Sequence, residues 1–250
     1  MTRFAMRLFK RFLLRVKPLY AWERAHRLSA KYDRQTVAVM QKVLTKDSNC
    51  IDVGCYEGRI LREILNYAPC GRHFAFEPIP RLAQALKETF LPFENVQVFD
   101  VALSDAAGTS TFQHVISAES YSGLRRRRYD RPREDVVEIR VKTGLLDDLI
   151  PQHISIHFIK VDVEGAELQV FRGGVQTISR TKPVIVFEHG LGAADYFGVK
   201  PDEVYDLLVN VCGLRVSLMD RFLSGCASLS RDAFRRQFHT NKNFYFVAYP

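Results

Sequence analysis

The stretch CIDVGCYEGRILREILNYA, residues 50–68, decides the fold class. Its first part, CIDVG, is a short apolar run that ends in a glycine and predicts a buried strand over 50–54. Residues 57–68 then place their apolar side chains at helical spacing and predict an amphipathic helix. A strand, a glycine-containing turn and a helix in this order are typical of a parallel sheet that is covered by helices.

The same alternation continues along the chain. Strand patterns cover 73–78, 95–103, 156–164 and 183–190, and helical patterns cover 80–90, 166–178 and 201–211. We therefore expect an α/β fold, a doubly wound and mostly parallel sheet with helices on both faces. Two further apolar runs, 214–220 and 243–250, are expected to close the sheet as a hairpin-like edge.

The middle of the chain follows a different pattern. Residues 108–115 and 136–141 alternate as half-exposed antiparallel strands do, and they bracket the polar segment 117–135. Six arginines within 125–133 make this segment an Arg-rich loop insertion. It is either a solvated loop balanced by its own acids or a clamp for a phosphorylated or carboxylated acceptor. Nucleic-acid binding is disfavoured, because Tyr129 is the single stacking ring and no RNA-binding motif accompanies it.

The charge divides the chain into two parts. The net charge is +8, yet residues 1–46 alone carry 12 Lys and Arg against two acids, which is +10, and residues 47–250 sum to −2. We therefore divide the chain into a basic helical arm, 1–46, and an α/β domain, 47–250. A nucleic-acid binder with an electropositive body is excluded by this distribution. Five cysteines without a C-x-x-C pair favour reduced thiols and a cytoplasmic location.

The arm begins with a basic amphipathic pattern over 4–20, followed by a second predicted helix over 21–43. Three interpretations stay open. The apolar face binds an anionic membrane surface through 1–20, which would place the protein peripherally at the inner membrane. Alternatively, it docks on the protein's own core or on a second subunit as a homodimer, or the arm is a cleaved Arg-rich transit peptide.

Candidate ligand-binding residues stand at the ends of the first two strands. Asp52 ends the first strand, and Gly54 and Gly58 lie in the turn before a helix whose N-terminus offers free N–H groups. The spacing G-x-x-x-G lacks the third glycine of a dinucleotide fingerprint, which favours a nucleoside ligand without a pyrophosphate. Glu77 ends the next strand, where a carboxylate can accept hydrogen bonds from a ribose.

Charged residues crowd the end of the strand in FIKVDVEGAE, residues 158–167. Ligands of open α/β sheets bind at this end, so Asp162 and Glu164 are candidates to pair with a cation, hold a metal or act as a general base. A solvated helix N-terminus explains Glu167 well and Asp162 poorly. Glu188 and His189 end the next strand and are expected to share the same crevice.

Taken together, IDVGCYEG, FAFEP, VALSDAAGTSTF and above all FIKVDVEGAELQVFRGG resemble the FkbM family of S-adenosylmethionine-dependent methyltransferases, over about residues 49–189. The resemblance implies a seven-stranded, Rossmann-like class I methyltransferase domain and O-methylation of a hydroxyl, in many relatives on sugars or polyketide-type products. It implies cofactor contacts from Asp52, Gly54, Gly58 and Glu77, adenine packing near Asp100 and Ala102, and a place beside the sulfonium and the acceptor for Asp162 and Glu164.

The expected mechanism is in-line transfer to an acceptor oxygen whose proton is removed. Asp162 and Asp52 would balance the positive charges of the cofactor. Glu164 would orient or deprotonate the acceptor, with Glu188 and His189 as competitors for this role. The acceptor contacts are assigned to the loop arginines Arg125, Arg126 and Arg127. A divalent metal stays open but unsupported, because these ligand types do not identify one.

Two other functions compete with this hypothesis. One is a non-catalytic, membrane-docked binding subunit that keeps only the fold, and the presence of every expected cofactor residue argues against it. The other is a dinucleotide-dependent oxidoreductase, which the absent third glycine disfavours. We expect an enzyme whose partners are a small-molecule or glycan acceptor rather than a nucleic acid.

Overall fold

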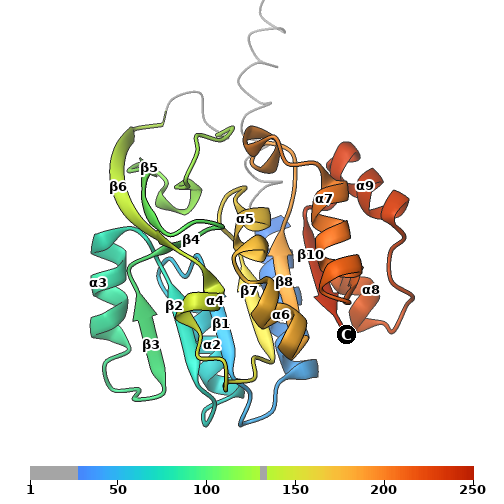
Figure 1. Ribbon diagram of the computed structural model, residues 1–250, viewed down its shortest axis with the longest axis horizontal. Coiled ribbons are helices and arrows are strands. Elements are labelled where there is room, and N and C mark those ends of the chain that lie inside the picture. Colours follow the sequence, from blue (N-terminus) through green and yellow to red (C-terminus); the bar gives the residue numbers. More distant parts are fainter. Residues whose placement is uncertain (1–27, 130–133) are drawn as a thin grey trace, which may run out of the picture.

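The structure is a computed structural model that describes residues 28–129 and 134–250 (Figure 1). The basic amphipathic pattern over 4–20 lies outside these residues. The later part of the predicted second helix lies within them, and residues 28–43 are helical.

A seven-stranded sheet forms the centre of the fold, with the strand order β3-β2-β1-β7-β8-β10-β9. β10 runs antiparallel to both of its neighbours, β8 and β9, and every other pairing in the sheet is parallel. This arrangement confirms the predicted fold class and the hairpin-like edge. The strands are β1 (Cys50–Val53), β2 (His73–Phe76), β3 (Val96–Phe99), β7 (Phe158–Val161), β8 (Val184–Glu188), β9 (Arg215–Ser217) and β10 (Tyr245–Tyr249).

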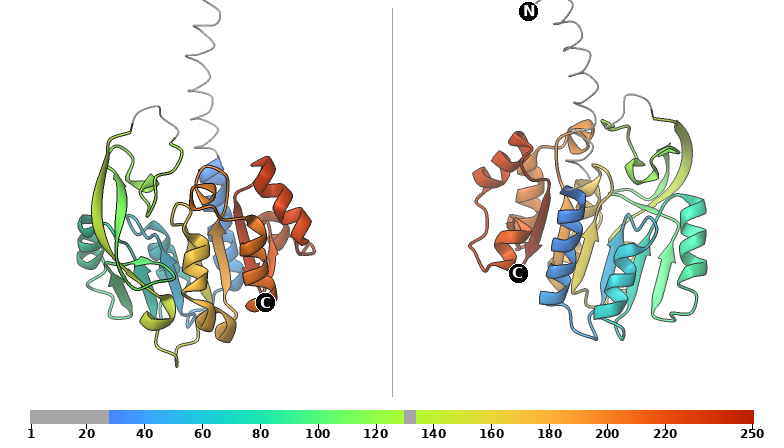
Figure 2. Two further views of the ribbon diagram at one scale, coloured as in Figure 1. Left: turned by 45° about the horizontal axis from the view of Figure 1, so that its top comes forward. Right: turned by 180° about the vertical axis from the view of Figure 1, so that it is seen from behind.

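Helices cover both faces of this sheet (Figures 1 and 2). One face packs against helix 28–43, α2, α3 and α8, and the other packs against α4, α5, α6, α7 and α9. The bounds are α2 (Arg59–Tyr67), α3 (Pro80–Thr89), α4 (Leu146–Leu149), α5 (Glu167–Arg172), α6 (Val175–Thr181), α7 (Pro201–Asp206), α8 (Met219–Leu223) and α9 (Arg231–Thr240). Short 3₁₀ turns are η1 (Glu119–Tyr121) and η2 (Ala194–Phe197), and a π-helical turn is η3 (Leu207–Val211).

The side-chain alternation of the strands builds two cores. On one face, residues such as Ile159 and Phe187 pack under α5 and α6. On the opposite face, Phe158 and Val186 pack against Met40 of helix 28–43, which is fully buried. Helix 28–43 therefore belongs to the hydrophobic core of the sheet.

The prediction of one continuous strand over 95–103 is wrong, because the structure has two separate strands there. β3 ends at Phe99, and the chain then leaves the large sheet and forms β4 (Ala102–Leu103). β4 pairs with β6 (Val136–Gly144), and β6 pairs with β5 (Gly108–Val115) in a separate three-stranded sheet. Figure 1 shows this second sheet beyond the carboxyl ends of β1, β2 and β3.

The single helix predicted over 166–178 is also wrong, because the structure divides it into α5 and α6 at Gly173 and Gly174. A Cβ atom at Gly173 would lie 2.1 Å from the Ser104 carbonyl oxygen. The backbone of the helix thus packs directly against the backbone that follows β4. Helix 201–211 likewise ends its α-helical part at Asp206 and continues as η3.

Within the ranges that the structure describes, no helix combines the length and the apolar character needed to cross a membrane.

Candidate functional site

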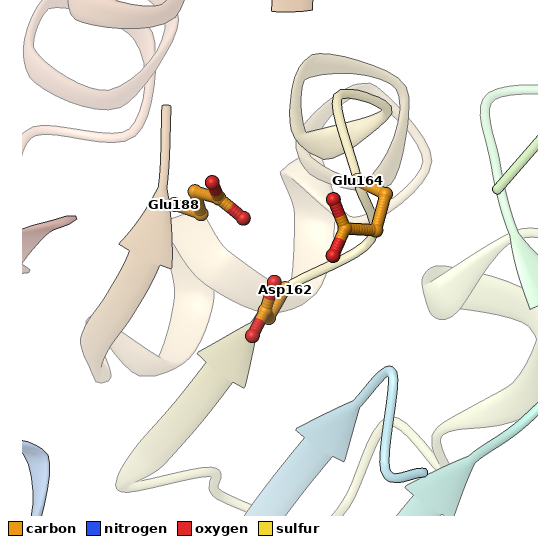
Figure 3. Close-up of side chains that lie close together, drawn as sticks. All are labelled: Asp162, Glu164 and Glu188. Atoms are coloured by element: carbon orange, nitrogen blue, oxygen red, sulfur yellow. The ribbon is translucent and has the colours of Figure 1, made fainter. Parts of the chain in front are cut away.

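A pocket opens at the carboxyl edge of the large sheet, where the turns after β1, β2 and β7 meet the second sheet. Its lining includes Gly54, Glu77, Ala102, Phe112, Asp162 and Glu164. Five of the residues that the sequence singles out therefore come together: Gly54, Glu77, Ala102, Asp162 and Glu164. Figure 3 shows Asp162 and Glu164 at the end of β7 and Glu188 at the end of β8.

Gly54 brings the turn after β1 against the segment after β7. Its φ is +74°, and a Cβ atom here would lie 1.9 Å from the Asp162 carbonyl oxygen. Only glycine fits both the left-handed backbone and this close approach. Gly58 has a similar φ of +76°, but a Cβ atom there would meet the side chains of Phe90 and Leu86. Gly58 therefore serves the packing of α2 on α3 and does not line the pocket.

Glu77 is fixed by two backbone donors. Its carboxylate accepts from the N–H of Tyr56 and from the N–H of Ile79, both at 2.9 Å. The side chain is nearly buried, and burial raises the pKa of Glu77 to about 7 despite these hydrogen bonds. A carboxylate so oriented at the end of β2 retains acceptor capacity for hydroxyl groups of a ligand in the pocket.

Lys160 contacts three groups at the base of the pocket. Its Nζ donates to the Gly54 carbonyl at 3.0 Å, and it lies 3.2 Å from Asp162 Oδ2 and 3.9 Å from Asp52 Oδ1. Burial alone would lower the pKa of Lys160, but the charges of Asp162 and Asp52 outweigh it and raise that pKa. Asp52 itself is fully buried below the pocket, does not line it, and burial raises its pKa.

Asp162 carries the negative charge of a carboxylate pair with Glu188. Burial opposes its ionisation, but the charge of Lys160 and hydrogen bonds from Tyr245 and Glu188 hold the pKa of Asp162 below its usual value. For Glu188, burial and then the charge of Asp162 raise the pKa well above its usual value. The pKa values of the two carboxyl groups are thus shifted in opposite directions, as expected for close carboxyl groups that interact.

Tyr245 is a site residue that sequence reasoning missed. Its hydroxyl donates to Asp162 Oδ2 at 2.6 Å. The residue lies on β10, 83 positions along the chain from Asp162, in an apolar stretch that also contains Phe244 and Phe246. Nothing in that stretch distinguishes this tyrosine from its aromatic neighbours, so no sequence signal could have identified it.

Glu164 occupies a strained position at the rim of the pocket. Its φ is +58°, a conformation that non-glycine residues rarely adopt and that costs on the order of 1–3 kcal/mol. Glu167 supports the turn, because one of its oxygens accepts from the N–H of Gly165 at 3.0 Å and from that of Val163 at 3.3 Å. Burial raises the pKa of Glu167 to about 7. Arg127 forms a salt bridge with the Glu164 carboxylate.

The start of the Arg-rich loop runs across the site. Arg125 donates to the Tyr196 carbonyl at 3.2 Å and lies 5.1 Å from the centre of the Phe197 ring. The backbone N–H of Arg128 donates to the Gly192 carbonyl at 2.9 Å. Arg126 is exposed. These contacts hold the loop, which lies between β5 and β6 of the second sheet, against η2 and the segment that precedes η2.

The three carboxylates Asp162, Glu164 and Glu188 are close enough to hold a metal ion, with one oxygen of each within 4.8 Å of the others. Two of them already face organic cations, since Lys160 contacts Asp162 and Arg127 contacts Glu164. For the third, Glu188, burial and the charge of Asp162 raise the pKa. The charges of this cluster thus fit Lys and Arg as counterions, and we derive no step through a metal.

Asp100 and His189 are further predicted site residues that do not line the pocket. Asp100 is partly exposed at the end of β3 and pairs with Lys87 and Lys142, each at 3.2 Å. The His189 ring stacks on Phe238 and Phe234, with centroid distances of 4.8 and 5.8 Å. Burial lowers the pKa of His189 to about 3, so the ring is neutral.

Comparison with known proteins gives consistent similarities. Residues 52–216 match the family described as the methyltransferase FkbM domain. The 2-O-methyltransferase NoeI of Sinorhizobium fredii is 32% identical over 173 residues, which cover 62% of this chain and 67% of that protein. The crystal structure of a methyltransferase FkbM from Methylobacillus flagellatus superimposes with a TM-score of 0.52 at 14% identity and covers 82% of this chain. The match spans 44% of that Methylobacillus chain, and at this identity it shows the fold alone.

Proposed function

The chain belongs to the FkbM family of S-adenosylmethionine-dependent methyltransferases, and from that premise we propose that it methylates a hydroxyl group of a sugar or glycan. The observation that carries the proposal is the position of an ionised Asp162 and of Glu164 together at the rim of the pocket. The similarity to NoeI, a 2-O-methyltransferase by its name, supports a sugar-type hydroxyl as the acceptor.

The pocket residues fit the cofactor. S-adenosylmethionine supplies a methyl group that its sulfonium already activates. Glu77 would accept hydrogen bonds from the ribose hydroxyls, and Ala102 with Phe112 would contact the adenine as an apolar surface. Asp162 carries a negative charge that compensates a cation in the pocket, while Gly54 keeps the backbone low enough for a ligand to approach.

The acceptor needs a group that orients its hydroxyl and takes its proton. We assign this role to Glu164, because it lines the pocket, Glu167 holds the turn that carries it, and Arg127 contacts its carboxylate. Glu188 is less suited to this role, since it is not among the residues that line the pocket. Arg127 faces Glu164 as the counterion, and with Arg125 and Arg126 it would contact polar groups of the acceptor.

The decisive experiment is transfer of a labelled methyl group from S-adenosylmethionine to a panel of free sugars, nucleotide sugars and oligosaccharides. We expect label in a sugar O-methyl ether for wild type. The Glu164→Gln variant should lose about 100-fold or more in kcat while its affinity for the cofactor, measured by calorimetry, is kept.

A matched control is Glu138→Gln, which makes the same change at an exposed position of β6. It should behave as wild type. Cofactor binding without label in any acceptor would favour the non-catalytic binding subunit instead. Retained turnover in Glu164→Gln would remove Glu164 from the proposed role without removing the activity.

A further inference from the structure

We propose that Tyr245 is a positioning residue for methyl transfer, which it serves by holding the carboxylate of Asp162, and that Tyr32 of helix 28–43 holds the Tyr245 ring in place. The inference rests on the proposed function, and it adds to the site a strand and a helix that lie outside the matched family region, residues 52–216.

The register of the sheet brings Tyr245 to the same face as the charged residues of the site. Tyr245 on β10 is the direct partner of Glu188 on β8, so both side chains point to the same face. Lys160 and Asp162 lie two residues apart and share that face as well. Four polar groups, Lys160, Asp162, Glu188 and Tyr245, therefore converge from β7, β8 and β10 on the face that helix 28–43 covers.

A hydrogen bond joins Tyr245 to Asp162. The Tyr245 hydroxyl and Lys160 Nζ contact the same oxygen, Asp162 Oδ2, at 2.6 and 3.2 Å. Two donors on one oxygen fix the rotation of the carboxylate group. Figure 3 shows one oxygen of Asp162 directed toward Glu164 and Glu188.

Aromatic contacts with Tyr32 hold the Tyr245 ring in place. Its ring stacks on that of Tyr32, with centroids 4.8 Å apart and an interplanar angle of 22°. Tyr32 also packs edge-on against Phe244, at 4.9 Å, and is 3% exposed. A buried aromatic stack leaves the Tyr245 ring little freedom, so its hydroxyl is directed at Asp162 before any ligand binds.

Tyr245 is not itself suited to exchange protons. Burial and then the charge of Asp162 raise its pKa well above the usual value, so the hydroxyl stays a donor. A neutral donor to an ionised carboxylate forms a short, strong hydrogen bond, which agrees with the distance of 2.6 Å.

The test compares Tyr245→Phe with Tyr249→Phe. Both remove one hydroxyl from the same face of β10, and the Tyr249 ring instead contacts Arg215 and Phe222, away from the pocket. We expect Tyr245→Phe to lower kcat about tenfold or more, with the affinity for S-adenosylmethionine within about threefold of wild type. Tyr249→Phe should keep wild-type kcat. Equal kcat in the two variants overturns the proposal.

A second measurement is independent of turnover. Urea unfolding at neutral pH is compared for wild type, Tyr245→Phe, Asp162→Ala and the double variant. If Tyr245 acts through Asp162, loss of the hydroxyl lowers the urea midpoint in the wild-type background and has little effect in the Asp162→Ala background. Equal shifts in both backgrounds overturn the contact. If wild type methylates no acceptor, the proposed function fails, and the unfolding cycle still decides whether Tyr245 holds Asp162.

Discussion

Replacement of Gly54 by alanine tests whether the site depends on the close approach of two backbone turns. Gly54 has φ +74°, which alone costs an alanine about 1–2 kcal/mol. The larger effect is steric, because the new Cβ would lie 1.9 Å from the Asp162 carbonyl oxygen. Backbone atoms cannot rotate away as a side chain can, so the turn after β1 and the segment after β7 must separate by about 1.5 Å to reach an ordinary contact.

This separation would displace Asp162 and the start of the turn that carries Glu164. A misplacement of about 1 Å at reacting groups costs roughly 100-fold in rate. We therefore expect Gly54→Ala to lose about 100-fold or more in kcat/KM and to bind S-adenosylmethionine more weakly. The free energy of unfolding should fall by more than the backbone conformation alone explains.

Gly225→Ala is the matched control. Gly225 has φ +69°, is exposed, and has no atom within 4 Å of an added Cβ. It therefore reports the conformational cost without the overlap. Urea unfolding and steady-state kinetics are measured on both variants. If Gly54→Ala keeps wild-type kinetics and loses no more stability than Gly225→Ala, the close approach is not what the site requires at this position.

Three further predictions concern single side chains. Glu77→Ala should weaken S-adenosylmethionine binding about tenfold or more in calorimetry, and unchanged affinity would refute the ribose assignment. Arg127→Ala should raise KM for a charged acceptor and reduce its salt dependence; an unchanged KM would leave Arg127 only as the counterion of Glu164. His189 has a folded pKa of about 3, below its unfolded value, so its contribution to stability is present above pH 6.5 and is lost as the pH falls. Between pH 7 and 5 this loss is about 2 kcal/mol, and His189→Phe should remove that part of the pH dependence of unfolding, which an unchanged slope would contradict.

The sequence predicts the parts of the fold that follow from local pattern. The alternation from 50 to 103 and from 156 to 190 contains the parallel strands in order, and the acids after FIKV mark the edge where the pocket opens. Glu77 and Asp162 could be assigned to the pocket because each directly follows a strand, and strand ends of a parallel sheet meet at one edge.

The remaining features depend on contacts that are distant in sequence. The break between β3 and β4 follows from pairing with β6, which begins more than 30 residues later. Tyr245 reaches Asp162 only because β10 inserts antiparallel beside β8. His189 follows a strand directly, as Glu77 and Asp162 do. Its ring nevertheless stacks on Phe234 and Phe238 of α9, a contact that is distant in sequence.

The departure of the chain from the large sheet after β3 has a consequence for how such enzymes diversify. The second sheet, η1 and the start of the Arg-rich loop all come from one uninterrupted segment between β3 and β7. Glu77 and the turn at Gly54 precede this segment, and Asp162 and Glu164 follow it. A crossover of coding sequence on each side would therefore exchange the Arg-rich loop as one cassette, together with Ala102 and Phe112, the proposed adenine surface. Chimeras of relatives built at these two junctions would show whether the acceptor changes while Gly54, Glu77, Asp162 and Glu164 stay the same.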